Sequence, residues 1–243
     1  MKQSELDVIL EKHKLWLDSN YTKGERANLH KANLTGVSFY KTNLREVNLS
    51  RADLRGANLS GAHLYKANLT GVNLIKANLY KTNLIEANLS RANLIGADLS
   101  EANLYKANLR EANLTEANLT EANLREAYLI RANLSGADLR EAHLYKANLR
   151  EANLSEANLR EANLIRADLY NTQGKTITTF QQNKDFAYHC DGVIKIGCIS
   201  LSTKEWLDRY KEIGDKEGYN INRMEAYGDF IEGCLRMEKK NAN

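Results

Sequence analysis

One histidine and two cysteines are the best candidates for metal ligands or reactive groups in this chain: His189, Cys190 and Cys198. Imidazole and thiolate are the ligands that zinc prefers in proteins. An Asp-Gly pair follows Cys190 and predicts a two-residue hairpin turn, with Cys190 opposite Val193 and Cys198 opposite Asp185. The two sulfurs would then lie ~17 Å apart along the ladder, too far for a shared zinc ion or a disulfide. We therefore expect no metal site and inert thiols.

The rest of the sequence offers little further chemistry. No Gly-rich phosphate loop, nucleophile elbow or convergent acid pair is present, so we expect no catalytic residue, no cofactor and no enzyme activity. His63 and His143 are isolated substitutions in a repetitive region. His13 and Trp16 could form a binding pair on a predicted helix, or belong to a cap that packs on neighbouring structure, and we favour the cap.

Composition limits the class of partner. The net charge of +3 is too small to indicate nucleic acid or a membrane as the partner. No run of eighteen apolar residues and no signal-peptide core is present, so we expect no membrane span and no export. Three cysteines, an odd number, favour a reducing compartment. We therefore expect a cytoplasmic protein.

The elements that must position the outward side chains are 29 consecutive pentapeptides, from Ala27 to about Asn171, without an insertion or deletion. The central residue is always Leu, except at Phe39, and the residue two before it is usually Ala. On a helix this period would step the leucines ~140° around the axis and leave no apolar face. Within one unit, however, Ala and Leu have strand spacing. The period therefore predicts short strands joined by corners, stacked into an all-β solenoid.

Runs such as Ala102-Asn103-Leu104-Tyr105-Lys106-Ala107-Asn108-Leu109 resemble the pentapeptide-repeat proteins. The resemblance covers residues 27–171. It implies a right-handed quadrilateral β-helix with four pentapeptides per coil, about seven coils, and residues twenty apart stacked on one face. It also implies that the central Leu and the small residue before it point inward, while the other three residues face out.

Three regions follow from this pattern. Residues 1–24 are expected to form an N-terminal capping helix, with Ser4 as its N-cap, and a linker. Residues 25–172 are expected to form the β-helix. Residues 173–243 are expected to form a small α+β appendage of a hairpin plus helices.

Several local signals define the predicted appendage. A short strand is expected at 176–180 and a hairpin at 186–199. Ser202 and Glu205 form a capping box that opens a helix, which Gly214 and Gly218 are expected to end. A second helix is expected at about 221–238.

One face of the solenoid collects Tyr, Ile and Arg, which are residue types common at protein interfaces. This predicted interaction face contains Arg45, Tyr65, Ile85, Tyr105, Arg125, Tyr145 and Ile165, flanked by Lys66, Lys106 and Lys146. The lysines alternate with glutamates from coil to coil, so the charges attract each other. The column is either a solvated zipper that holds the coils in register or a surface for a protein partner.

Charge also varies along the solenoid. Residues 25–95 carry ten Lys or Arg against four acids, whereas residues 96–170 carry nine against twelve. On a second face, Glu101, Glu121, Glu141 and Glu161 stack. The best-known members of the family that this chain resembles protect DNA gyrase, and they do so by imitating duplex DNA with strongly acidic surfaces. This half-basic solenoid disfavours a gyrase-binding mimic, and without an aromatic stacking platform it disfavours nucleic-acid binding.

Aromatic residues are concentrated in the appendage. Trp206, Tyr210, Tyr227 and Phe230 are candidate recognition residues, and some of this surface could pair with a second copy to form a homodimer. The sequence therefore predicts a non-enzymatic structural module that presents a rigid β-solenoid surface to another protein. The alternative is a DNA-mimicking protein that binds gyrase.

Overall fold

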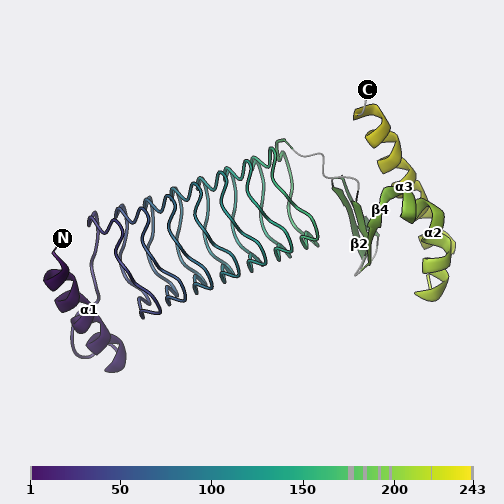
Figure 1. The fold of residues 1–243 in the computed structure, drawn as a ribbon. Helices are drawn as coiled ribbons and strands as arrows, with labels where there is room; N and C mark the ends of the chain where they lie inside the picture. The colour runs from purple at the N-terminus through teal and green to yellow at the C-terminus, as the bar shows by residue number, and fades with distance from the viewer. Residues whose placement is uncertain are drawn as a thin grey trace. The chain divides into compact units, whose positions relative to one another are not determined.

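The computed structural model describes residues 2–174, 178–182, 185–190, 193–196, 199–219 and 221–241 (Figure 1). The chain divides into two compact units, Met1–Lys175 and Thr176–Asn243. The first unit contains the helix α1 and the solenoid, and the second contains a small sheet and two helices.

Helix α1, Gln3–Asp18, packs on the first coil of the solenoid. It begins before Ser4, with Lys2 as its N-cap, so the prediction that Ser4 caps it was wrong. The Lys2 N–H instead donates to the Glu5 carboxylate at 3.1 Å. Leu6 and His13 are buried, and the His13 Nδ1 accepts the N–H of Ala27 at 3.1 Å. His13 therefore joins the helix to the first repeat, as the cap interpretation requires.

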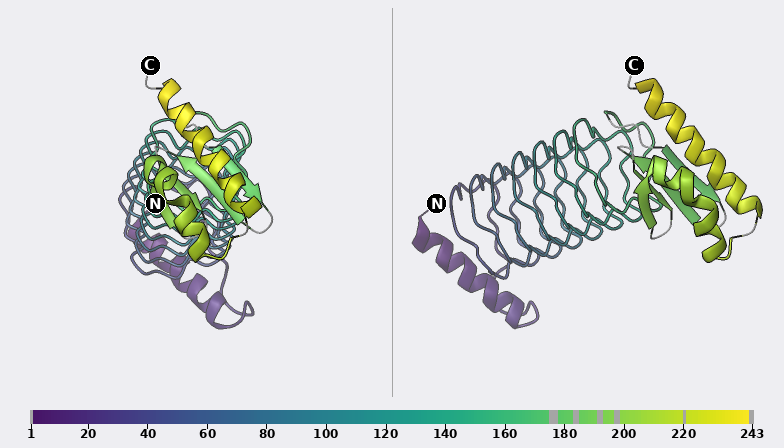
Figure 2. Two further views of the ribbon diagram at one scale, coloured as in Figure 1. Left: turned by 90° about the vertical axis from the view of Figure 1, so that its right-hand side faces the viewer. Right: turned by 45° about the vertical axis from the view of Figure 1, so that its right-hand side comes forward.

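The solenoid is a stack of coils with a strict register (Figure 2). Every isolated bridge in it is parallel and joins residues twenty apart, from Asn28↔Asn48 to Asn153↔Gln173. Four pentapeptides therefore complete one coil. The central side chains from Leu29 to Leu164 are at most 4% exposed, and together with the small residues before them they form a continuous apolar interior.

Each corner is a tight turn closed by a hydrogen bond, such as that from the Ala32 N–H to the Leu29 carbonyl at 3.1 Å. The second outer residue of each unit, from Lys31 to Asn171, has a positive φ, and the first does not, which defines a type II turn. Glycine, which adopts this conformation without strain, occupies only six corners. Charged residues fill most of the others, so the stacked ladder imposes the conformation.

The Asn-like residue before each central Leu stabilises its own corner. Its side-chain oxygen accepts the N–H two residues later, as Asn48 does from Ser50 at 3.2 Å. In several coils its amide also donates to the corresponding residue of the previous coil, as Asn48 does to Asn28 at 2.9 Å. The preference for Asn and Asp at this position thus reflects turn capping and side-chain rungs between coils.

The second unit contains an antiparallel sheet of four strands in the order β1-β2-β3-β4. The strands are β1 Thr178–Gln182, β2 Asp185–Cys190, β3 Val193–Ile196 and β4 Ile199–Ser202. Helices α2, Thr203–Lys216, and α3, Ile221–Asn241, pack together beside the sheet (Figure 1). The core of the unit is formed by Ala187, Ile194, Ile196, Trp206, Ile213, Tyr227, Ile231 and Cys234.

The predicted hairpin is confirmed where its two strands begin to pair and is wrong at its far end. Cys190 pairs with Val193 as expected. However, β3 ends at Ile196, and Ile199 pairs with Ile196 as the first residue of β4 instead of extending the hairpin. Cys198 lies outside the described residues. The ~17 Å separation therefore loses its basis, because it assumed one long hairpin.

The helices of this unit begin close to their predicted positions. The Ser202 Oγ accepts the Glu205 N–H at 3.2 Å, which confirms the capping box at the start of α2. The helix continues through Gly214 to Lys216, whereas we expected Gly214 to help end it. Helix α3 begins at the predicted residue and extends beyond 238.

Candidate interaction surface

The twenty-residue register aligns the residues of the predicted interaction face. Consecutive bridges from Asn43↔His63 to His143↔Asn163 place their positions in adjacent coils. We call this surface the tyrosine face. It comprises the column Arg45, Tyr65, Ile85, Tyr105, Arg125, Tyr145 and Ile165, with the corner column Glu46, Lys66, Glu86, Lys106, Glu126, Lys146 and Arg166.

The tyrosines of this face are half-buried, and each lies beneath a lysine ammonium. The Nζ atoms of Lys66 and Lys106 each lie 5.0 Å from the centroid of the tyrosine ring that precedes them, and that of Lys146 lies 5.3 Å from the Tyr145 ring. Arginines from the preceding coil approach two of these rings, at 5.4 Å for Tyr65 and 5.6 Å for Tyr145. Such cation–π contacts restrain the rings and keep them displayed on a fixed ladder.

The corner charges pair between coils, as the alternation predicts. Lys66 lies 3.6 Å from Glu86, and Lys106 lies 3.6 Å from Glu126. The Tyr65 hydroxyl, and then Glu86, raise the pKa of Lys66 above its ordinary value. Both interpretations from the sequence, a zipper between coils and a surface for a partner, are compatible with this geometry.

The alternation ends at Arg166, which follows Lys146 in the corner column. Its guanidinium donates to the Tyr145 hydroxyl at 3.4 Å. Close by, a shallow hollow of about 180 Å³ is lined by Arg125, His143, Tyr145 and Asn163. His143 is therefore part of an open basic surface rather than of an enclosed site.

The glutamate column on the neighbouring face is only partly neutralised. Glu101 accepts the Tyr80 hydroxyl at 2.9 Å and lies 3.1 Å from Lys81, and these contacts lower the pKa of Glu101. Glu121, Glu141 and Glu161 are exposed, and none of them forms an ion pair with a residue that the structure describes. The acidic stretch is thus short and lies beside a mixed-charge face.

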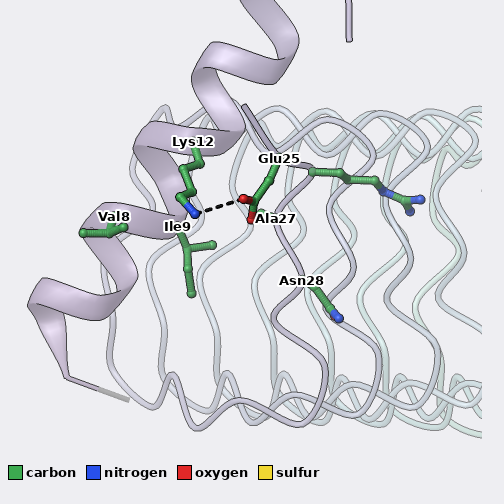
Figure 3. A pocket seen from close by; sticks show the side chains of 7 residues that line it. Val8, Ile9, Lys12, Glu25, Ala27 and Asn28 are labelled. Carbon is green, nitrogen blue, oxygen red and sulfur yellow. Dashed lines mark hydrogen bonds and ion pairs between the residues drawn. The ribbon is translucent and has the colours of Figure 1, made fainter. Parts of the chain in front are cut away.

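A second hollow of about 180 Å³ lies between α1 and the first coil (Figure 3). Val8 and Ile9 line it from the helix. Lys12 and Glu25 form an ion pair of 3.0 Å along its edge. This lining offers no nucleophile beside a base and no convergent acid pair. The hollow is better explained by incomplete packing of the cap than by catalysis.

Metal ligands do not converge in the part of the chain that can be described. No group of three or more His, Cys, Asp or Glu side chains there could hold a metal ion. Cys234 is buried and forms no disulfide. Within the same described residues, no helix combines the length and the apolar character needed to cross a bilayer.

The structure divides the four candidate residues of the appendage. Trp206 and Tyr227 are each 2% exposed, and the Trp206 Nε1 donates to the Ile194 carbonyl at 2.7 Å. Buried rings cannot contact a partner while the unit keeps this fold, so these two residues serve its core. Tyr210 and Phe230 are partly buried against that core. A recognition role for Tyr210 and Phe230 stays a prediction, and we assign it below to a second copy of this chain and not to the partner of the tyrosine face.

One outward residue was missed by sorting only the two outer positions of each unit. Tyr128 occupies the position before the central Leu, where Asn is usual, and it is 47% exposed. The signal was available in the sequence, because a tyrosine cannot provide the corner hydrogen bond that Asn provides.

The fold and the surface place this protein among the β-solenoids, a non-globular class whose outward side chains form repetitive columns. The family model for pentapeptide repeats matches eight copies, over residues 25–61, 48–84, 67–110, 107–144 and 142–173. The chain belongs to the pentapeptide-repeat family. Members of this family are right-handed quadrilateral β-helices, and the twenty-residue register above is that fold.

Three solved structures are similar to parts of this chain. HetL from Nostoc sp. strain PCC 7120, involved in heterocyst differentiation regulation, is 35% identical; the match covers 60% of this chain and 81% of that chain, with a TM-score of 0.22. Rfr23 from Cyanothece 51142 is 27% identical over 67% and 97% of the two chains, with a TM-score of 0.20. QnrB1, a plasmid-mediated fluoroquinolone resistance protein, is 17% identical over 60% and 79%, with a TM-score of 0.42. No curated protein sequence matches the chain.

Proposed function

We propose that this protein is a non-enzymatic binding module, whose solenoid of about seven coils presents the tyrosine face to another protein. The observation that carries this proposal is the column of half-buried tyrosines, each beneath a lysine, on a ladder with one register. Tyrosine and arginine contribute most to binding energy at many protein interfaces. A rigid ladder also loses little conformational freedom on binding.

A gyrase-directed DNA mimic is the alternative function. We consider this alternative because the chain is similar to QnrB1. However, a mimic of duplex DNA requires a continuous negative surface. Here Lys66 and Lys106 neutralise the glutamates of the next coil. We therefore expect no inhibition in a supercoiling assay with gyrase from the source organism. Dose-dependent inhibition at micromolar protein would favour the mimic instead.

Two further expectations belong to this proposal. The appendage is proposed to pair with a second copy through partly exposed aromatic residues such as Tyr210 and Phe230. The module is proposed to act in the cytoplasm. Light scattering on the full-length protein tests the first, and a monomer would remove it. Fractionation of the source cells tests the second.

Site-specific photo-crosslinking tests the tyrosine face. A photoreactive phenylalanine analogue replaces Tyr105, and in a matched control it replaces Ile95, a half-buried residue at the equivalent position of another face. Each full-length protein is irradiated in a lysate of the source organism. We expect one saturable crosslinked partner from position 105 and none from position 95. Equal crosslinking from both positions would contradict a face-specific function.

A triple substitution complements the crosslinking. Tyr65, Tyr105 and Tyr145 are changed to Ser, which Ser50 and Ser90 show to be compatible with this position of the repeat. We expect the variant to fold and to lose the crosslinked partner. Retention of the partner at unchanged affinity would overturn the proposal.

A further inference from the structure

Tyr128 interrupts the polar ladder that runs along the face next to the tyrosine face. Its neighbours in the ladder, Asn108 and Asn148, each accept the N–H two residues later at 3.2 Å. A tyrosine side chain has no oxygen near its own corner, so the N–H of Ile130 lacks this partner. The chain therefore gives up a stabilising hydrogen bond here and exposes 47% of an aromatic residue.

Cations occupy the four positions diagonal to this ring in the adjacent coils. The bridges of Tyr128 to residues 108 and 148 fix which residues lie diagonally beside it in the adjacent coils. With ~4.8 Å between coils and ~3.3 Å per residue along the chain, each diagonal position is ~8 Å away. The four diagonal neighbours are all exposed, and they are Lys106, Arg110, Lys146 and Arg150.

Two of these four cations are already compensated. Lys106 lies 3.6 Å from Glu126, and Arg150 lies 3.5 Å from Asp168. Arg110 and Lys146 form no ion pair with any residue that the structure describes. They lie on opposite sides of the ring.

The acids on the border of this area are also occupied. Glu111 accepts from Arg91 at 2.9 Å, and Glu151 accepts from Arg131 at 2.7 Å. An exposed ring between two uncompensated cations therefore remains, along a line from Arg110 through Tyr128 to Lys146.

We propose that this line, the cationic diagonal, binds an extended acidic segment of another protein in which two carboxylates flank an apolar side chain. In an extended peptide, alternate residues share one face at ~6.6 Å intervals, close to the ~8 Å steps of the diagonal. The apolar side chain covers the ring of Tyr128, and the carboxylates reach Arg110 and Lys146. This site goes beyond the proposed function because it lies on another face, and it shares only Lys146 with the tyrosine face.

A protein segment fits these charges better than a nucleic acid. Single-stranded nucleic acids require successive stacking rings along a continuous basic track. Here a single ring lies on the diagonal, and Glu111 and Glu151 border it. Two carboxylates on a short segment match the two free cations in number and position.

The first experiment measures fluorescence anisotropy of a labelled Glu-Ser-Leu-Ser-Glu peptide, blocked at both ends, with the full-length protein at low salt. We expect saturable binding that the Tyr128→Asn variant and the Arg110→Glu variant each weaken at least ~10-fold. The same peptide with Lys in place of Glu should not bind. Unchanged binding by Tyr128→Asn would overturn the proposal.

The Tyr128→Asn variant carries its own control for folding. Asparagine restores the acceptor for the Ile130 N–H and the rungs to the neighbouring coils. We therefore expect its melting temperature to rise by about 2–4 °C while binding is lost. Loss of binding with a lowered melting temperature would indicate a folding defect. It would contradict the proposal that Tyr128 lowers stability but provides an aromatic ring for binding.

The chain offers a matched control in the same ladder. Asn68→Tyr places a tyrosine three coils earlier, where its diagonal neighbours are Glu46, Ser50, Glu86 and Ser90. We expect this added ring to create no second site for the acidic peptide, measured in the Tyr128→Asn background. Binding equal to that of the wild type would show that any exposed ring suffices and would overturn the diagonal.

Two outcomes separate the alternatives. A labelled oligothymidine that binds more tightly than the peptide, and depends on Tyr128, would overturn the protein segment in favour of nucleic acid. Failure of peptide binding while crosslinking from position 105 persists would overturn the diagonal alone and leave the proposed function standing.

Discussion

In the solenoid, one buried Leu recurs every five residues, and its N–H donates to the carbonyl of the Asn-like residue in the next coil, whereas in the C-terminal unit each buried contact joins a different pair. Repetition makes the interior of the solenoid uniform, so that its outward columns are the only place where units differ. The C-terminal unit instead uses its most distinctive side chains, such as Trp206, to build its own core. Aromatic content alone therefore does not indicate a binding surface.

The most damaging substitution is expected in the C-terminal unit, where one residue carries a large share of the core. Trp206→Ala removes a buried indole and its bond to the Ile194 carbonyl, at a cost of about 3–5 kcal/mol. Hydrogen exchange should show lost protection throughout residues 178–241 and unchanged protection in the solenoid. Lys204→Ala, an exposed control on the same helix, should change neither region. Loss of protection in both regions would contradict separate units.

Within the solenoid, position along the stack should matter more than residue identity. Leu104→Ala, in a central coil, leaves a cavity closed by coils on both sides and should cost about 2–5 kcal/mol. Leu34→Ala should cost less, because the first coil has a neighbouring coil on one side only. Chemical denaturation of both variants measures the difference. Equal losses would argue against a stacked interior with weaker ends.

The outward Asn ladder should contribute a smaller amount, in proportion to its bonds. Asn118 accepts the N–H and hydroxyl of Thr120 at 3.1 and 2.8 Å and donates to Asp98 at 3.1 Å. Asn118→Ala should therefore cost about 1–2 kcal/mol. Asn73→Ala, which loses only the bond from Ile75, should cost about half as much. Thermal melts of the two variants would reject this account if their order were reversed.

The smallest predicted effect is a pH dependence at the junction of α1 and the solenoid. Burial is the main cause that lowers the pKa of His13, so folding favours its neutral form. The unfolded chain binds this proton first, and His13 should therefore reduce stability as the pH falls through about 6.5. Melting temperatures at pH 7 and 5.5 should fall more for the wild type than for His13→Gln, whose amide can still accept the Ala27 N–H. An identical fall in both would contradict the assignment.

The stacking of the solenoid followed from the sequence because its causes are local. The spacing of Ala and Leu placed both side chains on one face, and the resemblance to pentapeptide-repeat proteins supplied their inward direction and the twenty-residue register. The corner conformation could not be predicted in this way. Lys31 and Glu46 have no intrinsic preference for positive φ, and they adopt it because the ladders of adjacent coils require a type II turn.

The C-terminal unit was harder to predict because its contacts are not repeated. The Ser202 capping box identified the start of α2 from four residues. The length of the hairpin depended on where β3 ends, which no residue spacing determined. Trp206 and Tyr227 were chosen for their size, yet their burial depends on how the sheet and two helices pack. The residues of the tyrosine face could be predicted from the twenty-residue register. The exposure of Tyr128 could be predicted only with the knowledge that Asn normally accepts a hydrogen bond at this corner.

Recognition by the solenoid is tested by comparing the two regions as binding surfaces in the full-length protein. Once crosslinking has identified the partner, its affinity is measured by calorimetry for the wild type, for the Tyr65, Tyr105 and Tyr145→Ser variant, and for a Tyr210 and Phe230→Ser variant. We predict that the first variant loses at least ~10-fold in affinity and that the second retains wild-type affinity. The reverse result would place recognition in the C-terminal unit and contradict the account.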